Sequence, residues 1–162
     1  MAEVFAQDAV AFARKVALLR PPTADRPGQV TVGDFSIKLD YSDASIRQVE
    51  EILAECHRGL VAANPSPEQI ERYARIFGCY IGETFRRNHR ATWGATPSDN
   101  GKMPSMRSDC SGTVFYPWMR AHKRITIGES ENVMAYYQYL LDELKGAAQP
   151  PPLPIPPRLP RS

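Results

Sequence analysis

The chain has 162 residues, of which 43% are hydrophobic and 23% charged, and its formal net charge is +2. This composition predicts one globular domain with a sizeable core, and the small net charge argues against a general nucleic-acid-binding surface. No stretch approaches the roughly 20 apolar residues of a membrane span, and the N-terminus lacks the basic start of a signal peptide. We therefore expect a cytoplasmic protein that does not bind membranes.

The first part of the chain predicts two helices separated by a β-hairpin. Apolar residues at helical spacing predict an amphipathic helix over residues 4–19, which a proline-rich stretch ends. Alternating apolar residues over 30–39 then predict the hairpin. A second helix is expected to be capped by Ser42 or Asp43 and to run to about Val61.

The strongest helical signal begins at Ser66, which is placed to cap a helix with Pro67 as its first residue and Gln69 in a capping box. An apolar stripe extends this helix to about Asn88. Together with the helix before it, it is predicted to form an α-helical hairpin. The stripe consists of Ile70, Ala74, Phe77, Ile81 and Phe85.

Gly78 and Gly82 lie four residues apart within this helix. Each glycine costs roughly 1 kcal/mol relative to alanine in a helix interior, so a structural gain must offset that cost. We expect the gain to be the close approach of a neighbouring helix or sheet at both glycines.

The rest of the chain predicts two strands and two helices. A short strand is expected around Trp93, then a turn-rich loop, and then a strand region over residues 103–117 that is clearest at residues 113–116. Pro117 stops that strand and opens a short helix. After Gly128 a last amphipathic helix is predicted over residues 129–145.

This order of elements predicts a single α+β domain over residues 1–146, in which an antiparallel sheet packs against the helical hairpin and the terminal helices. Residues 147–162 are proline-rich and predict an extended polyproline II tail. Its P-x-x-P units with Arg158 and Arg161 have the chemistry of an SH3 ligand, but a solvated spacer is the favoured interpretation.

The cysteines and histidines show no spacing typical of a metal site. Cys56 and His57 are adjacent, and adjacent side chains on a helix point about 100° apart, so they seldom share a metal ion. We expect no metal and no other cofactor, and free thiols.

Residues 109–112, Asp-Cys-Ser-Gly, resemble the nucleophile segment of NlpC-type cysteine peptidases. The resemblance implies that Cys110 is a nucleophile, which needs a base, and only His122 follows it while His89 precedes it. The residues after Cys110 favour a strand, whereas the peptidase nucleophile begins a helix. We interpret Cys110 as a strand or turn residue and keep a cysteine hydrolase as an alternative.

Residues 77–94 and 115–137 resemble an uncharacterised family of small bacterial proteins. That family carries a Tyr-x-Gly-Glu, Arg-Arg and Trp pattern, followed by aromatic-Pro, Lys-Arg and a Gly-acidic helix start. The resemblance covers about half of the chain and implies no particular activity. The matching positions are Gly82, Glu83, Arg87, Trp93, Pro117, Lys123 and Arg124.

Glu83 is expected to be partly buried, and a buried carboxylate needs a cationic partner. Arg87 has the favourable i, i+4 spacing, and Lys123 or Arg124 is expected to tie the central helix to the exit of the sheet. The open alternative is one basic surface for an acidic partner or a phosphate. It would combine Arg86, Arg87, His89, Arg90, Lys123 and Arg124.

Trp93 and Trp118 lie at predicted element ends beside glycine, proline and basic residues. Tryptophan and arginine are the residues that binding hot spots use, although closing a small core is the alternative role for a tryptophan. The candidate binding residues are Arg86, Arg87, Arg90, Trp93, Trp118, Lys123 and Arg124, and the candidate structural residues are Gly78, Gly82, Glu83 and Pro117.

The favoured function is that of a non-catalytic, cytosolic protein-binding protein. Within that class we expect an immunity protein that neutralises a secreted bacterial toxin, because small α+β proteins are common in that role. One alternative is an NlpC-like hydrolase using Cys110 with His122. The other is a nucleic-acid-binding regulator, which is least favoured because the chain shows no helix-turn-helix pattern.

Overall fold

The computed structural model of the protein describes residues 1–17, 39–63, 65–98 and 101–148. Within these residues it forms a single α+β domain, which confirms the predicted fold class. The predicted hairpin at 30–39 and most of the predicted tail lie outside the described residues, so they stay predictions. In chain order the elements are α1 (Ala2–Ala17), α2 (Ser45–Ala63), α3 (Pro67–His89), β1 (Ala91–Ser98), β2 (Gly101–Ser108), β3 (Val114–Phe115), α4 (Pro117–Thr126), a 3-10 turn (Glu129–Glu131) and α5 (Val133–Ala148).

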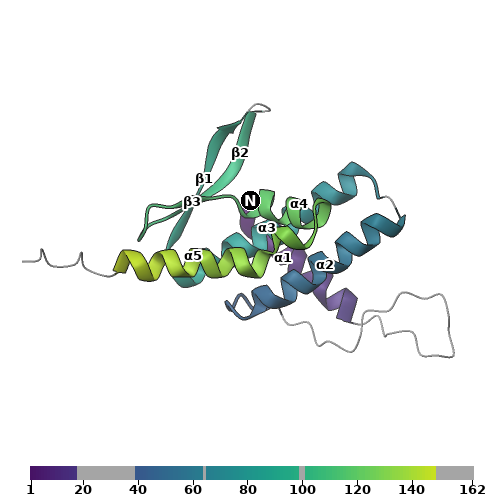
Figure 1. Cartoon of the computed structure of the whole chain (residues 1–162), viewed down its shortest axis with the longest axis horizontal. Helices are drawn as coiled ribbons and strands as arrows, with labels where there is room; N and C mark the ends of the chain where they lie inside the picture. Colours follow the sequence, from purple (N-terminus) through teal and green to yellow (C-terminus); the bar gives the residue numbers. More distant parts are fainter. Residues whose placement is uncertain (18–38, 64, 99–100, 149–162) are drawn as a thin grey trace, which may run out of the picture.

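Helix α3 lies at the centre of the molecule (Figure 1). Its start follows the predicted capping box: the Ser66 hydroxyl accepts from the Gln69 amide at 3.3 Å, and the Gln69 side chain accepts from the Ser66 amide at 3.0 Å. Every residue from Ile76 to Phe85 is buried, on all sides of the helix. A helix that is buried all round needs neighbours on several faces.

Two of these neighbours approach at the glycines, which confirms the expected close contacts. A Cβ atom at Gly78 would lie 2.4 Å from the Cα atom of Trp118, at the start of α4. A Cβ atom at Gly82 would lie 2.3 Å from the ring of Trp93, on β1. One glycine therefore admits a helix backbone and the other admits the sheet.

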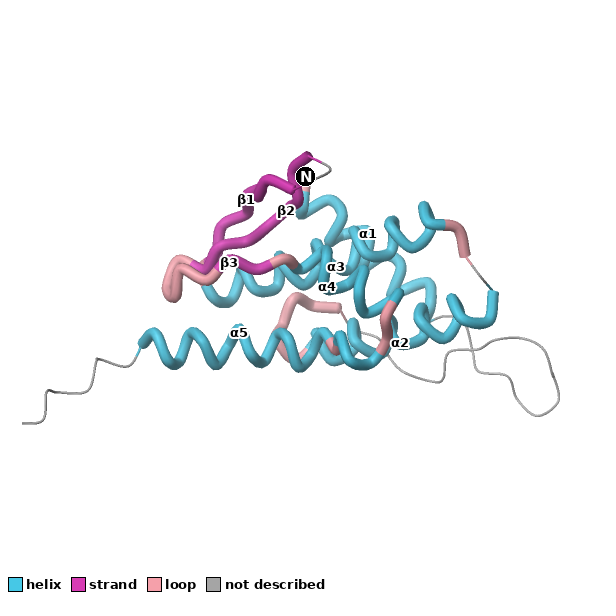
Figure 2. Tube along the Cα trace, turned by 45° about the horizontal axis from the view of Figure 1, so that its top comes forward, coloured by secondary structure: helices cyan, strands magenta, loops and turns pink. Residues whose placement is uncertain are grey.

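The helices do not pair as a simple α2–α3 hairpin. Helix α3 packs chiefly against α1 and α4, and α2 packs chiefly against α4 and α5. Figure 2 shows α5 running along one side of this helical body. The physical reason is that Gly78 lets α4 lie directly on α3, so α4 covers part of the α3 surface that α2 was expected to cover.

The sheet is built around a hairpin that projects from the helical body (Figure 1). Strands β1 and β2 pair antiparallel from Ala91 opposite Ser108 to Ser98 opposite Gly101, and β3 adds only a short third strand. The predicted turn-rich loop is therefore shorter than expected, because β1 extends to Ser98 and β2 begins at Gly101. The strand region predicted from residue 103 is confirmed by β2. The strand predicted at 113–116 is present in shortened form.

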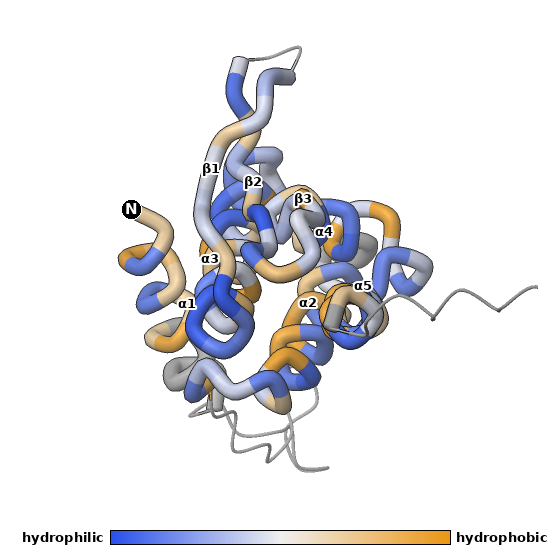
Figure 3. Tube along the Cα trace, turned by 90° about the vertical axis from the view of Figure 1, so that its left-hand side faces the viewer, coloured by the Kyte–Doolittle hydropathy of each residue, from blue (hydrophilic) through white to orange (hydrophobic). Residues whose placement is uncertain are grey.

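Only the base of the hairpin joins the core. Met106 and Phe115 are buried there, and the Phe115 ring meets the Phe85 ring with centroids 4.8 Å apart. Figure 3 shows the most apolar positions on the helices, whereas the projecting hairpin is mostly pale or blue. Within the described ranges, no helix combines the length and hydropathy that crossing a membrane requires.

The last helix starts later than residue 129, where the sequence predicts it. Residues Glu129–Glu131 form a 3-10 turn, and α5 begins at Val133. Two side chains fix this start: Asn132 accepts from the Ala135 amide at 2.9 Å, and Glu50 of α2 accepts from the Val133 amide at 2.8 Å. The second of these contacts is long-range and leaves no local sequence signal.

Candidate functional site

The buried carboxylate of Glu83 is the centre of the candidate site. The side chain is only 2% exposed and accepts a 2.7 Å hydrogen bond from the indole Nε1 of Trp93. The Arg86 guanidinium donates through Nε at 3.1 Å and through Nη2 at 2.9 Å. Burial raises the pKa of Glu83, but the hydrogen bonds from Arg86 and Trp93 and the nearby arginine charges outweigh burial and hold this pKa below its usual range.

Arg87 extends the site from α3 to two other parts of the chain. Its Nε lies 3.7 Å from the Glu83 carboxylate, and its Nη2 donates to Glu3 of α1 at 3.1 Å. The guanidinium also lies over the Tyr41 ring, 3.7 Å from the ring centroid. Tyr41 has a positive φ of 60° and stacks on Tyr80, whose hydroxyl accepts from the Tyr41 amide at 2.8 Å. Cation–π stacking and the ion pairs therefore fix Arg87 in position.

The expected pairing of Glu83 with Lys123 or Arg124 is wrong. Arg124 pairs instead with Glu50 of α2 at 2.6 Å, and Lys123 lies 4.0 Å from Glu131. Arg120 also pairs with Glu131. Helix α4 meets α3 at Gly78 with its first residues and also packs on α2, so Arg124 reaches Glu50 of α2, while Arg120 and Lys123 face Glu131 of the 3-10 turn that follows.

The predicted binding residues therefore divide into three groups. Arg86, Arg87, Arg90 and Trp93 lie at the C-terminal end of α3 and the base of β1, and we call these four the arginine–tryptophan surface. Arg86 is 41% and Arg87 34% exposed, and Arg90 is exposed at the left-handed C-cap. The second group is Trp118, whose ring lies 4.9 Å from the Arg75 guanidinium, and the third is Lys123 and Arg124.

Cys110 lies in the turn between β2 and β3, consistent with its interpretation as a strand or turn residue. No helix begins at this cysteine, since α4 starts only at Pro117. Within the described part of the chain, no hydrogen bond joins the exposed Cys110 thiol to His122 or to His89. The peptidase arrangement of a nucleophile at a helix start beside its base is therefore not formed by these residues.

A second polar cluster escaped the sequence analysis. One carboxylate oxygen of Asp43 accepts from the Tyr137 hydroxyl at 2.6 Å and from the side-chain amide of Asn88 at 3.1 Å, and the other oxygen lies 2.8 Å from Nε2 of His89. Burial and the bond to Asp43 raise the pKa of Tyr137 far above its usual value. The buried Tyr137 side chain directs its hydroxyl at the partly exposed Asp43, so we interpret the cluster as a structural link between the turn before α2, helix α3 and helix α5.

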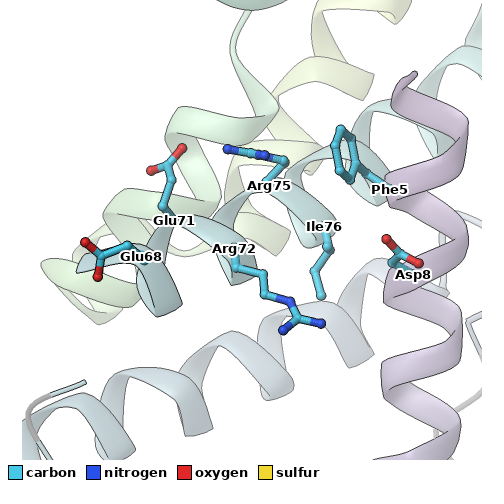
Figure 4. A pocket seen from close by; sticks show the side chains of 7 residues that line it. All are labelled: Phe5, Asp8, Glu68, Glu71, Arg72, Arg75 and Ile76. Atoms are coloured by element: carbon cyan, nitrogen blue, oxygen red, sulfur yellow. The ribbon is translucent and has the colours of Figure 1, made fainter. Parts of the chain in front are cut away.

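Figure 4 shows a pocket between α1 and the first turns of α3. Its volume is about 440 Å³, and Phe5, Asp8, Glu71, Arg72, Arg75 and Ile76 are among its lining residues. None of the candidate binding residues lines it. Among the described residues, no group of three or more histidine, cysteine, aspartate or glutamate side chains is arranged to hold a metal ion.

Comparisons of the chain with protein-family models, with curated proteins and with solved structures find no match. The resemblance to the small bacterial family and the weaker likeness to NlpC-type peptidases therefore stay predictions. Any functional conclusion has to come from the geometry of the sites described above.

Proposed function

We propose that this protein is a non-catalytic protein-binding protein whose contact surface is the arginine–tryptophan surface. The observation that carries the proposal is the buried Glu83 carboxylate, which binds Trp93 and Arg86 while 41% of the Arg86 side chain stays exposed. Arginine and tryptophan dominate binding hot spots. Side chains that are already fixed lose less entropy on binding, and this preorganisation favours affinity.

The charges of this surface favour a partner with acidic groups. Arg86, Arg87 and Arg90 contribute three guanidinium groups, and the carboxylates of Glu83 and Glu3 pair with the first two of them. Guanidinium groups have N–H donors in a planar fork, so bonds to Glu83 leave others for a carboxylate of the partner. The projecting β1–β2 hairpin lies beside this surface and would extend the contact area.

The narrower form of the proposal is an immunity protein that binds and neutralises a bacterial toxin in the cytoplasm. It rests on the sequence-based argument that small α+β proteins are common in this role. Arg120, Lys123 and Arg124 face acidic residues of their own chain. These ion pairs offset positive charge that nucleic-acid binding would use to neutralise phosphates, which supports protein binding over nucleic-acid binding.

The test is capture of a partner by the tagged full chain expressed in the cell that encodes it. We expect one stoichiometric protein, and we expect Arg90→Asn to weaken its binding about tenfold or more, since hot-spot residues contribute that much. Asparagine tolerates the left-handed conformation of residue 90, so this variant keeps the backbone.

Arg58→Gln, which removes an exposed arginine from α2, is the matched control and should bind as wild type. The proposal fails if no protein is captured, or if Arg90→Asn and Arg58→Gln bind the captured protein equally well. Toxin neutralisation is tested separately, by asking whether co-expression of the chain restores growth of cells that express the captured partner.

A further inference from the structure

The pocket between α1 and α3 is a site distinct from the arginine–tryptophan surface (Figure 4). Its α3 wall comes from Glu68 to Ile76, in the first half of the helix, whereas the surface lies at the helix end and on β1. The α3 residues of the wall are spaced three and four apart, so they share one face. Helix α1 supplies the opposite wall through Phe5 and Asp8.

Arg75 packs against aromatic rings at this pocket but lacks a hydrogen-bond acceptor at one buried atom. Its guanidinium contacts two aromatic rings, 5.3 Å from the centroid of Phe5 and 4.9 Å from that of Trp118. Its Nε is buried and has no hydrogen-bond partner among the described residues. An unsatisfied buried donor costs free energy. The other two guanidinium nitrogens are not among the buried unpaired atoms, so a ligand carboxylate can reach them, and arginine binds carboxylates best through such a fork of N–H donors.

Carboxylates line the same pocket beside this guanidinium. Figure 4 shows Glu71 near the guanidinium end of Arg75, with Asp8 across the pocket on α1. No ion pair joins Glu71, Asp8 or Arg75 to another residue in the described ranges. Arg72 and Glu68 also line the pocket and add one charge of each sign. A simple anion would therefore face the carboxylates, and a simple cation would face the guanidinium groups.

A zwitterion avoids both problems. An α-amino acid has its carboxylate and its ammonium group on the same carbon atom, so it needs a cationic and an anionic partner side by side. Arg75 and Glu71 provide that pair, and Phe5 and Ile76 provide apolar surface for a side chain. The volume of about 440 Å³ falls within the usual range of small-ligand sites.

We propose that this pocket binds a free α-amino acid with an apolar side chain. The ligand carboxylate accepts from Arg75, the ligand ammonium pairs with Glu71, and the side chain packs on Phe5 and Ile76. This proposal does not depend on the protein-binding function, because it uses different residues at the other end of α3.

The experiment is isothermal titration calorimetry of the full chain with L-leucine. N-acetyl-L-leucine, which lacks the ammonium charge, and L-leucinamide, which lacks the carboxylate, are the matched probes. We expect saturable binding of L-leucine and at least tenfold weaker binding of both capped forms, since each loses a charged hydrogen bond. Glu71→Gln and Arg75→Gln should each weaken L-leucine binding to a similar degree, and Arg58→Gln should not change it.

Arg75→Gln also removes ring contacts, so its circular dichroism spectrum must match wild type before its affinity is interpreted. If that variant does not fold, Glu71→Gln and the two capped probes decide the matter. Absence of saturable binding by L-leucine up to ~10 mM, a range that covers even weak ligands, overturns the proposal. So does equal binding of either capped form, or an unchanged affinity in Glu71→Gln.

Discussion

Replacing the two helix glycines Gly78 and Gly59 by alanine should have opposite effects on stability. Both lie inside helices, so helix propensity alone predicts that each alanine stabilises the fold by about 1 kcal/mol. At Gly59 of α2 no atom lies within 4 Å of the added methyl group, and this full gain is expected. At Gly78 the methyl group would lie 2.4 Å from the Cα of Trp118 and 2.8 Å from its amide nitrogen.

The contact at Gly78 is with backbone, which cannot rotate away as a side chain can. The Cα of Trp118 lies about 1 Å inside the range of ordinary van der Waals contact, so α4 must shift away from α3. Overpacking of this kind costs about 1–3 kcal/mol or more, and the shift also strains the Arg124–Glu50 pair at the far end of α4. We expect Gly78→Ala to lower the free energy of unfolding by about 2 kcal/mol after its propensity gain is included.

Thermal melts of wild type and the two variants, followed by circular dichroism, provide the measurement. For a chain of this size 1 kcal/mol corresponds to roughly 2–4 °C, so Gly59→Ala should melt a few degrees above wild type and Gly78→Ala about 4–8 °C below it. Urea unfolding at 25 °C checks that the slopes agree. A Gly78→Ala protein as stable as Gly59→Ala would show that α4 does not lie on α3 at this position.

Three further predictions concern buried titratable groups. Glu83→Gln should lower the free energy of unfolding by about 1–3 kcal/mol at pH 7. The pKa of Glu83 is lower in the folded than in the unfolded chain, so the difference in unfolding free energy between wild type and variant, measured with urea, should shrink as the pH falls below about 4.3. Burial raises the pKa of Cys56 and Cys79 to about 11, so a thiol reagent should modify the exposed Cys110 first and the other two only when the chain unfolds. Modification of Cys110 faster than free cysteine would instead favour the hydrolase alternative. Because burial raises the pKa of Tyr137, an ultraviolet titration should show this tyrosine ionising only when the chain unfolds, and the folded state should lose stability as the pH rises above about 10. Tyr137→Phe should remove the part of the absorbance change that accompanies unfolding.

The features that the sequence predicts correctly are those with local causes. The capping box needs only Ser66 and its next three residues, and the glycines of α3 indicate close contacts because glycine is costly in a helix. Neither observation says which element makes the contact. The direction of α4 depends on its fit against Gly78, and that direction decides which acidic residues Arg124 can reach.

Long-range pairings account for most of what the sequence analysis missed. The sequence predicts a strand region from residue 103 but neither the start of β2 at Gly101 nor its pairing along the whole length of β1, because Gly101 and Pro104 have little strand preference. The bond between Asp43 and Tyr137 joins residues 94 positions apart, and no spacing rule covers such a distance. By contrast, the Glu83–Arg86 pair is an i, i+3 contact that helical geometry could have indicated.

The energetics of Glu83 favour a role in positioning the arginine–tryptophan surface over a role in stability alone. Replacing a buried ion pair by apolar side chains is often neutral or even stabilising, because desolvation of the charges offsets most of their attraction. The buried carboxylate gives the fold less net stability than its bonds suggest, yet it sets the positions of Trp93, Arg86 and Arg87. In Glu83→Gln the amide oxygen can still accept hydrogen bonds, but the neutral side chain no longer attracts both arginines. This variant should therefore lose a larger share of its partner affinity than of its free energy of unfolding.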